Sequence, residues 1–377
     1  MFNASKKSTI AAALAACALL VPGAAQAAWT NASGTVATTD SQLSGVACVT
    51  ASNCLLVGLQ SGTTTRALAS KWNGSTFTAL TTASTTSELY GTGCNSATLC
   101  FAVGTDYATG AVPHAEKYNG TTWTNSTVPT PSGSTFAELT SVACPGATSC
   151  FADGWYQTAT ATQPIIDSWN GTTWTAASLT LPSGTTSAEL LDVACTSTTA
   201  CTAVGDYQTS AVPSPRTLVL RFNGTAWSVQ TSANPSGTTS AQLQGVACTS
   251  ATSCQAVGSA VDASGNQNAL AESWNGTTWT LKTVALPSGA TAAGLLDVSC
   301  SSGTACSAVG SYSSSVGNVE PEAASWNGTA WTLQTVPKGT GNTDAQLAGV
   351  ACPSTCVADG LLVNSSGLLR PAVDFGP

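Results

Sequence analysis

Apolar and polar positions along this chain recur in a unit that occurs seven times. Each copy contains a variant of the pattern Leu-x-x-Val-Ala-Cys, then a short polar gap, a second Cys and a small apolar run that ends in Gly, as between Leu190 and Gly205. The period is 46 to 53 residues, measured between the first Cys of successive copies: Cys48, Cys94, Cys144, Cys195, Cys248, Cys300 and Cys352. Periods of this length are typical of repeat arrays, solenoids and propellers.

Each copy predicts four short β-strands. The first strand has a Leu five residues before the first Cys in every copy, and the small residues near the Cys suit strands crowded around a central axis. The second strand is predicted to run from the second Cys to a Gly four residues on: Gly58, Gly104, Gly154, Gly205, Gly258, Gly310 and Gly360. The third strand ends at an aromatic residue: Trp72, Tyr118, Trp169, Phe222, Trp274, Trp326 and Phe375. The fourth follows an Asn-Gly pair, which predicts a two-residue hairpin turn in six copies, and carries the next aromatic: Phe77, Trp123, Trp174, Trp227, Trp279 and Trp331.

The seventh copy lacks a fourth strand, because the chain stops two residues after Phe375. A matching piece lies at the other end, where residues 28–31 resemble the start of a fourth strand at residues 122–125. The N-terminal strand can therefore complete the last sheet, and pairing of the first and last segments leaves no open edge. We predict an all-β, seven-bladed β-propeller of four-stranded antiparallel blades, closed by its N-terminal strand.

The first 27 residues have the pattern of a secretory signal peptide. Lys6 and Lys7 form a charged start, residues 10–21 are an apolar run, and residues 25–27 form a small-x-small cleavage site. The apolar run is too short for a membrane span, and no later segment is long and apolar enough. The sequence therefore predicts a signal peptide at residues 1–27.

Residues 28–377 are predicted to be a single secreted domain. Cys17 lies in a stretch that resembles a bacterial lipoprotein box, which leaves membrane anchoring at Cys17 as an alternative. Lipidated cysteines are usually followed by polar residues, whereas apolar residues follow Cys17. Ordinary secretion is the favoured interpretation.

The charge of the mature chain bears on its partners. Removal of the signal peptide leaves 8 Lys and Arg against 18 Asp and Glu, a net charge of −10. This balance disfavours nucleic acids and acidic membranes. Charged residues make up only 7% of the chain, but 43% hydrophobic residues with regular aromatic spacing indicate a packed core rather than disorder.

Fourteen of the fifteen Cys fall in pairs, two to a copy. Evenly paired Cys in an exported chain are typical of a disulfide set. A metal site would need clustered Cys or His ligands, and the chain has a single His, His114, so we expect no metal. Each disulfide should join the first two strands of one blade and stabilise it by about 2 kcal/mol. The expected pairs are Cys48–Cys54, Cys94–Cys100, Cys144–Cys150, Cys195–Cys201, Cys248–Cys254, Cys300–Cys306 and Cys352–Cys356.

A Gly after an apolar strand, an aromatic before a tight turn and a Trp shortly afterwards recur together, as at Gly205, Phe222 and Trp227. In these respects residues 28–377 resemble the kelch and galactose-oxidase-like propellers. The resemblance implies the architecture but no particular activity, since one fold hosts many functions. The chain departs from kelch repeats by its single Gly and its paired Cys. A copper oxidase of this type would need two His ligands, so the lone His114 argues against copper chemistry and we expect no cofactor.

Strand direction alternates within a blade, so the turns fall on two faces. The turns between strands one and two and between strands three and four are short and share one face. The connections between strands two and three, such as residues 206–216, and between blades, such as residues 176–189, are longer and share the other face. Because binding residues tend to lie on loops of a rigid scaffold, this long-loop face is the candidate binding face.

Polar and aromatic residues gather on the long-loop face. The position six before the first Cys carries Glu in three consecutive copies, and the loop predicted after the second strand carries Tyr in the same copies. Trp155 is the one Trp that the repeat does not account for. Aromatic rings beside carboxylates suit sugars or extended peptides, because ring faces cover C–H groups while polar groups bind hydroxyls or amides. The predicted ligand-binding residues are Trp155, Tyr107, Tyr156, Tyr207, Glu88, Glu138 and Glu189.

A structural interpretation of the same positions is also open. Polar residues commonly precede a strand, and Tyr is common at strand ends for packing reasons. Asp153 and Asp359 replace the Val that precedes the second-strand Gly in other copies, and we interpret them as solvated strand ends rather than ligands. The aromatics of the third and fourth strands are assigned to packing between blades.

Catalytic motifs are scarce in the sequence. It has no Gly-x-Ser-x-Gly elbow, phosphate loop or calcium-binding loop, and a Ser-His-Asp triad would have to use His114. Glu88, Glu138 and Glu189 could still pair across the channel for carboxylate-based glycoside hydrolysis. We expect a secreted, monomeric, non-enzymatic propeller that binds an extracellular glycan or a protein or peptide ligand. The alternatives are a carbohydrate-active hydrolase or lyase and a structural extracellular protein.

Overall fold

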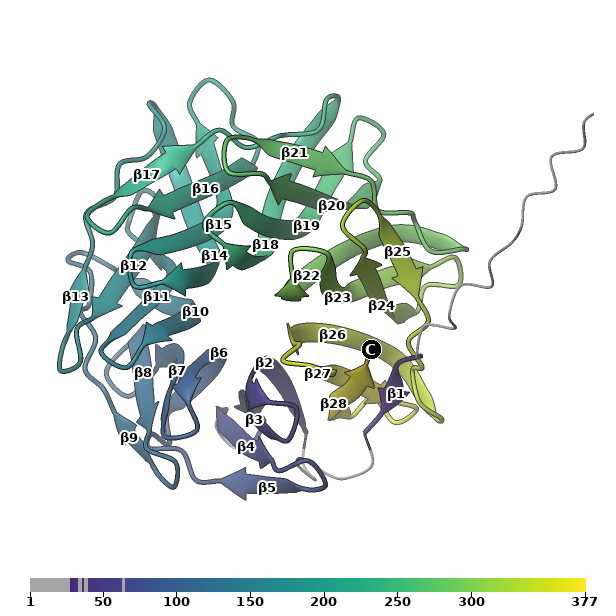
Figure 1. Ribbon diagram of the computed structural model, residues 1–377, viewed down its shortest axis with the longest axis horizontal. Helices are drawn as coiled ribbons and strands as arrows, with labels where there is room; N and C mark the ends of the chain where they lie inside the picture. The colour runs from purple at the N-terminus through teal and green to yellow at the C-terminus, as the bar shows by residue number, and fades with distance from the viewer. Residues whose placement is uncertain (1–27, 33–35, 37–39, 63–64) are drawn as a thin grey trace, which may run out of the picture.

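Seven sheets surround a central axis in the computed structural model, which describes residues 28–32, 36, 40–62 and 65–377 (Figure 1). Each sheet has four antiparallel strands, with the first strand of the repeat innermost. The predicted all-β, seven-bladed propeller is thereby confirmed. The predicted signal peptide, with Cys17, lies outside the described residues.

The strands of blades 1 to 6 follow one another along the chain. Blade 1 holds β2 (Ser41–Thr50), β3 (Asn53–Gln60), β4 (Arg66–Trp72) and β5 (Phe77–Leu80), and blade 2 holds β6 (Ser87–Ser96), β7 (Leu99–Asp106), β8 (Val112–Tyr118) and β9 (Trp123–Asn125). Blade 3 holds β10 (Phe136–Gly146), β11 (Ser149–Gln157), β12 (Thr162–Trp169) and β13 (Trp174–Ala176), and blade 4 holds β14 (Thr185–Ser197), β15 (Ala200–Thr209), β16 (Arg216–Phe222) and β17 (Trp227–Gln230). Blade 5 holds β18 (Thr238–Ser250), β19 (Ser253–Asp262), β20 (Gln267–Trp274) and β21 (Trp279–Lys282), and blade 6 holds β22 (Ala290–Ser302), β23 (Ala305–Ser314), β24 (Val319–Trp326) and β25 (Trp331–Gln334).

Blade 7 joins the two ends of the chain, as predicted. It holds β26 (Asn342–Ala351), β27 (Cys356–Asn364) and β28 (Leu369–Gly376), and its outer strand is the N-terminal β1 (Thr30–Asn31). The Asn31 side chain donates a hydrogen bond of 2.8 Å to Asp374. Trp29, just before β1, is 2% exposed and packs in one cluster with Val309 and Leu347, so it belongs to the core of the ring.

A β-bulge in the innermost strand of every blade decides which side chains reach the central channel. In blade 4 the extra residue is Leu191, which directly follows the pair formed by Leu190 and Gly205. A Cβ atom on Gly205 would collide with the carbonyl of Glu189, and the same obstruction recurs in every blade, which explains the Gly in each copy. The bulged residues line a central cavity of about 230 Å³: Ser44, Tyr90, Thr140, Leu191, Gln244, Leu296 and Ala348.

The hairpin turns lie where the sequence predicts them, but their central residues differ. Trp72 pairs with Phe77, and the Asn73 amide donates to the carbonyl of Thr76, so Gly74 and the following Ser are the two central residues. The Asn73 side chain stands outside this pair and accepts hydrogen bonds from the two amides that follow Gly74. Asn thus caps the turn, while Gly supplies the positive φ of 94°. The other five Asn-Gly turns have the same closing hydrogen bond.

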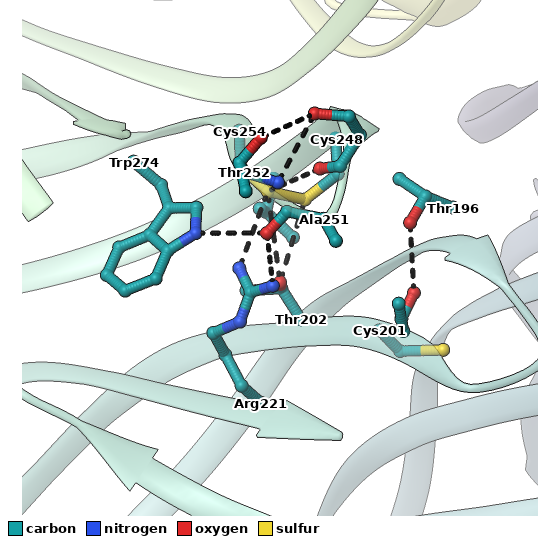
Figure 2. The surroundings of a disulfide bond; sticks show 12 residues. Thr196, Cys201, Thr202, Arg221, Cys248, Ala251, Thr252, Cys254 and Trp274 are labelled. Carbon is teal, nitrogen blue, oxygen red and sulfur yellow. Dashed lines mark hydrogen bonds between the residues drawn. A yellow bond between two sulfur atoms is a disulfide. The ribbon is translucent and has the colours of Figure 1, made fainter. Parts of the chain in front are cut away.

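All seven predicted disulfides are present, each within one blade. The preceding blade also contacts the turn that a disulfide closes. Figure 2 shows this for the turn between Cys248 and Cys254, where Arg221 of β16 donates a 2.7 Å hydrogen bond to the carbonyl of Ala251. The Trp274 indole donates to the same carbonyl at 3.2 Å, and the Arg221 guanidinium lies 4.9 Å from the centre of that ring. The short-turn face is therefore a packing surface between blades.

Aspartates of the innermost strands link neighbouring blades at the channel wall. Asp192 of β14 accepts a 2.6 Å hydrogen bond from the Ser141 hydroxyl of blade 3 and a 2.7 Å bond from the Val246 amide of blade 5. Asp297 of β22 likewise accepts a 2.7 Å bond from the Val350 amide of blade 7. A carboxylate can therefore satisfy backbone donors that the bulges leave between blades.

The interpretation of Asp153 and Asp359 as solvated strand ends is wrong, because both side chains are 0% exposed. Each lies on the second strand opposite a small residue of the first strand, Ser141 or Gly349. A Cβ atom on Gly349 would collide with the Asp359 carboxylate, so the missing side chain makes room for the acid. In blades 4 and 6 the arrangement is reversed, with Asp on the first strand and Val on the second.

These acids predict that the protein is more stable in mild acid than in mild alkali. Burial raises the pKa of Asp192, Asp297 and Asp153, and it raises the pKa of Asp359 to about 7. A carboxyl group with a raised folded-state pKa keeps its proton after the unfolded chain has ionised, so stability falls as the pH rises from about 4 to about 7. Urea denaturation should give a larger free energy of unfolding at about pH 5 than at about pH 8. The opposite order would contradict the raised pKa values of these acids.

Ring closure predicts that Trp29 contributes strongly to stability. Trp29→Ala should lower the free energy of unfolding by about 3–5 kcal/mol, as expected for truncation of a buried aromatic. The control is Val316→Ala, since Val316 is 80% exposed and its loss should change stability by less than about 0.5 kcal/mol. Equal urea midpoints for the two variants would show that the N-terminal segment does not hold the ring closed.

Candidate functional site

The three predicted glutamates lie on the innermost strands of consecutive blades, at the long-loop end of the channel. Their cross-strand partners on the second strands are Thr105 for Glu88, Trp155 for Glu138 and Asp206 for Glu189. The bulged residue that lines the channel follows two positions after each glutamate, so the glutamates lie along one side of the channel mouth. We call the following residues the mouth cluster: Glu88, Tyr90, Tyr107, Glu138, Trp155, Glu189, Asp206, Gln242 and Gln244.

In blade 2, two tyrosines flank Glu88. The Tyr90 hydroxyl donates a 2.6 Å hydrogen bond to Glu88, and the Tyr107 hydroxyl lies 3.4 Å from the same oxygen. Burial and the bond to Glu88 raise the pKa of Tyr90, so its hydroxyl stays a donor. Tyr107 directly follows β7 and is 44% exposed, which presents its ring to solvent at the mouth.

In blade 3, Trp155 and Glu138 form one unit. Trp155 lies within β11 rather than on the predicted loop, because the second strand is paired on both sides as far as Gln157. Its ring stacks on Phe136, with centres 5.1 Å apart and an interplanar angle of 26°. Burial raises the pKa of Glu138 to about 7; the charges of Glu189 and Glu88 raise it further, and a hydrogen bond from the Trp155 indole opposes the rise. Trp155 therefore has a packing contact as well as a place at the mouth.

In blade 4, Glu189 and Asp206 form a carboxyl pair held by an amide. The Gln242 side chain of blade 5 reaches both groups, with its nitrogen 2.7 Å from an oxygen of each. Gln244 donates a 2.6 Å hydrogen bond to the oxygen of Gln242, which orients the amide. Burial, the charge of Glu189 and a hydrogen bond to Glu189 raise the pKa of Asp206 to about 7, so the pair can hold one proton between two oxygens.

The structure does not bring Tyr156 and Tyr207 to the mouth. Side chains alternate between the faces of a strand, so Tyr156 points away from the face that carries Trp155. Tyr156 packs against the hydrophobic cluster between blades 2 and 3, and Tyr207 against the cluster between blades 3 and 4. Both lie on second strands rather than on the predicted loops.

Sequence reasoning missed Tyr90 and Gln244, the two members of the mouth cluster that also line the central cavity. Both occupy the bulge position four residues before the first Cys, where the other copies carry Ser, Thr, Leu or Ala. Their departure from the small or aliphatic residues at that position is a signal that could have found them. The bulge that turns them towards the channel is not visible in the sequence.

Two further observations limit the chemistry of the site. Among the described residues, no group of three or more His, Cys, Asp or Glu side chains is arranged to hold a metal ion. In the same part of the chain no helix is long and apolar enough to cross a membrane. The seven disulfides are those of a protein that folds in an oxidising compartment.

Comparison with known proteins identifies the fold alone. No protein-family model and no curated protein matches the chain. Among solved structures, the WD40 β-propeller domain of Doa1 is similar, with 11% identity, a TM-score of 0.54, and coverage of 91% of this chain and 96% of that one. The GH74 xyloglucanase from Xanthomonas campestris is 13% identical, with a TM-score of 0.55; the match covers 91% of this chain and 55% of the xyloglucanase. The polysaccharide lyase PL25, an ulvan lyase, is 8% identical, with a TM-score of 0.53; the match covers 92% of this chain and 93% of the lyase. The kelch resemblance is therefore supported only at the level of the propeller architecture.

The electrostatic coupling of the mouth cluster can be tested with one substitution. Glu189→Gln removes a negative charge beside two acids, so the pKa of both Glu138 and Asp206 should fall towards ordinary values. Carboxyl carbon shifts in an NMR pH titration measure both groups. The control is Glu320→Gln, since Glu320 pairs with Lys338 in another blade and should leave both pKa values unchanged. Unchanged values after Glu189→Gln would show that blades 3 and 4 do not share one site.

Proposed function

We propose that the protein is a secreted, non-enzymatic propeller that binds an extracellular carbohydrate at the mouth cluster. The observation that carries this proposal is the gathering of two partly exposed aromatic rings with carboxylates and amides from blades 2 to 5 at one channel mouth. Trp155 and Tyr107 supply the ring faces, and Glu88 and Glu138 lie beside them. An extended peptide is the other ligand class that suits this combination of groups.

The chemistry of sugars fits this arrangement. A pyranose ring presents C–H groups on one face, which pack on a flat aromatic ring, and hydroxyls at its edge, which need both donors and acceptors. Glu88 and Glu189 supply acceptors, while the Tyr107 hydroxyl supplies a donor as well. The acidic chain disfavours anionic ligands, so a neutral or cationic sugar is the expected class.

A carbohydrate-active hydrolase or lyase is the second candidate, and one observation favours it. Glu189 and Asp206 lie close enough to share a proton, and Asp206 has a pKa of about 7, as a general acid requires. Against this, the Gln242 amide bonds both carboxyls and keeps them together, whereas hydrolysis needs them on opposite sides of the scissile bond. Binding without turnover is therefore favoured.

The proposal is tested by screening the protein on glycan and peptide arrays, with reducing-sugar and unsaturated-product assays run in parallel on polysaccharides. Binding of a glycan without product formation supports the proposal. Product formation that Asp206→Asn abolishes would assign the hydrolase or lyase instead. Retention of peptides alone would replace the carbohydrate by a peptide ligand.

Trp155 provides the sharpest prediction for the glycan or peptide that the arrays identify. Trp155→Ala should weaken its binding by about 1–3 kcal/mol, since a stacking ring is lost. Trp155→Phe keeps a flat ring and should retain most of the affinity. Trp174→Ala is the control for core damage and should cost about 3–5 kcal/mol of stability. Calorimetry and urea denaturation of the three variants separate the effects; normal binding by Trp155→Ala would make Trp155 only a packing residue.

A further inference from the structure

A second cavity lies at the outer edge of blade 3, and no mouth-cluster residue lines it. Its walls come from the β9–β10 connection at residues 129–132, the β13–β14 connection at Leu179 and Leu181, and the first part of β12 at residues 163–167. Its volume is about 500 Å³, within the range of roughly 300–1,000 Å³ found for small-molecule pockets. Beside it, β13 is three residues long and pairs with residues 167–169, so the upstream part of β12 has no fourth-strand partner.

One buried acid, Asp167, lines this pocket. Its side chain is 0% exposed, and neither carboxyl oxygen has a hydrogen-bond partner. Leaving such a group unsatisfied in the interior costs free energy, so native proteins rarely keep one without a role. The other lining residues include no Lys, Arg or His, and they are mainly apolar, with Tyr156, Ile165 and Leu181 among them. Asp167 is therefore the only charged residue among those that line this pocket.

The same position of the repeat is satisfied in two other blades. Glu116 accepts hydrogen bonds of 2.8 Å and 3.0 Å from the amides of Ala83 and Ser84, in the connection that precedes its blade. Glu272 accepts a 3.0 Å bond from the amide of Ala233 and bonds from the Ser232 hydroxyl. In blades 2 and 5, the carboxylate two residues before the third-strand aromatic thus binds the incoming connection.

Blade 3 departs from that arrangement in two ways. Asp167 is one methylene group shorter than Glu116, so it reaches less far. Pro129 occupies the place of Ser84, counted from the end of the preceding strand, and Pro has no amide N–H to donate. The incoming connection is also ten residues long, at 126–135, against six at 81–86. Together these changes leave the carboxyl group without the partners that Glu116 and Glu272 have.

We propose that this pocket binds a small organic amine, whose ammonium group pairs with Asp167 and whose compact apolar body packs between the two connections. An ammonium ion supplies both the charge and the N–H donors that a buried carboxylate lacks. The apolar walls favour an aromatic or branched aliphatic body over a polar one. The net negative charge of the chain attracts cations to the site. This site is independent of the carbohydrate proposal, since the mouth cluster contributes no residue to it.

Proton release should accompany binding of the amine. Burial raises the pKa of Asp167 to about 7, so the free pocket is largely protonated in mild acid. The ammonium ion binds the carboxylate form, and affinity should therefore rise with pH, by up to about tenfold per pH unit below 7. A neutral ligand would show no such dependence.

The experiment compares phenethylamine with phenethyl alcohol, which has the same body and no charge. Calorimetry on the whole protein should show that the amine binds at least about tenfold more tightly than the alcohol at about pH 8. The amine itself should bind less tightly at about pH 5 than at about pH 8. Asp167→Asn should weaken amine binding about tenfold or more and abolish its pH dependence. The matched control is Glu322→Gln, because Glu322 is 1% exposed with unpartnered oxygens but lies in blade 6; it should leave amine binding unchanged.

Three results would overturn the proposal: no binding of the amine, equal binding of the alcohol, or unchanged amine affinity in Asp167→Asn. If Asp167→Asn does not fold, NMR of the native protein still tests the proposal. Methyl resonances of Ile165, Leu179 and Leu181 should then shift on addition of phenethylamine but not of the alcohol. Methyl shifts elsewhere alone would also place the amine outside this pocket and refute the assignment.

Discussion

The close approach of the first two strands of each blade is the constraint on which the ring depends. Seven innermost strands converge on one axis, and each carries a bulge that brings its backbone over the second strand. Only Gly fits beneath it, because a Cβ atom on Gly205 or its equivalents would strike a carbonyl oxygen. The bulge in turn sets the cavity lining and exposes backbone donors between blades, which Asp192 and Asp297 satisfy. Channel, inter-blade contacts and the position of the mouth cluster all follow from this one piece of backbone geometry.

The architecture was predictable because seven copies repeat the same apolar, Gly and Cys positions, so one copy constrains the others. Ring closure was predictable from the match of residues 28–31 to a fourth strand. Which residues occupy the centre of the hairpin turns was not predictable, since an Asn-Gly pair fits a turn with Asn inside or outside the central pair. Only the hydrogen bonds of Asn73 show that Asn lies outside it. Asp153 and Asp359 were misinterpreted because their burial depends on Ser141 and Gly349, which lie opposite them in the sheet but twelve and ten residues away in the chain.

The candidate site was partly predictable as a set of departures from the repeat. Trp155 and the three glutamates stood out in this way, and four of these positions lie together at one mouth. Tyr90 and Gln244 were missed because the bulge that aims them is invisible in one sequence. The pocket in front of Asp167 was beyond sequence reasoning for a different reason. Its carboxyl group is unpartnered because Asp167 is short and because Pro129, on a longer connection from the preceding blade, replaces a donor; that relation exists in space alone.

Closure of the ring by its two ends also orders the assembly of the protein in time. In six blades the strands are consecutive, and the disulfides join residues six or, in blade 7, four apart, so these contacts form at little entropic cost. The last sheet requires Thr30 to meet Phe375, which lies 345 residues further along the chain. A polypeptide that emerges N-terminus first holds Trp29 unpaired until its final strand arrives. We therefore expect ring closure, which needs the pairing of β1 with β28, to be the slow last step of folding.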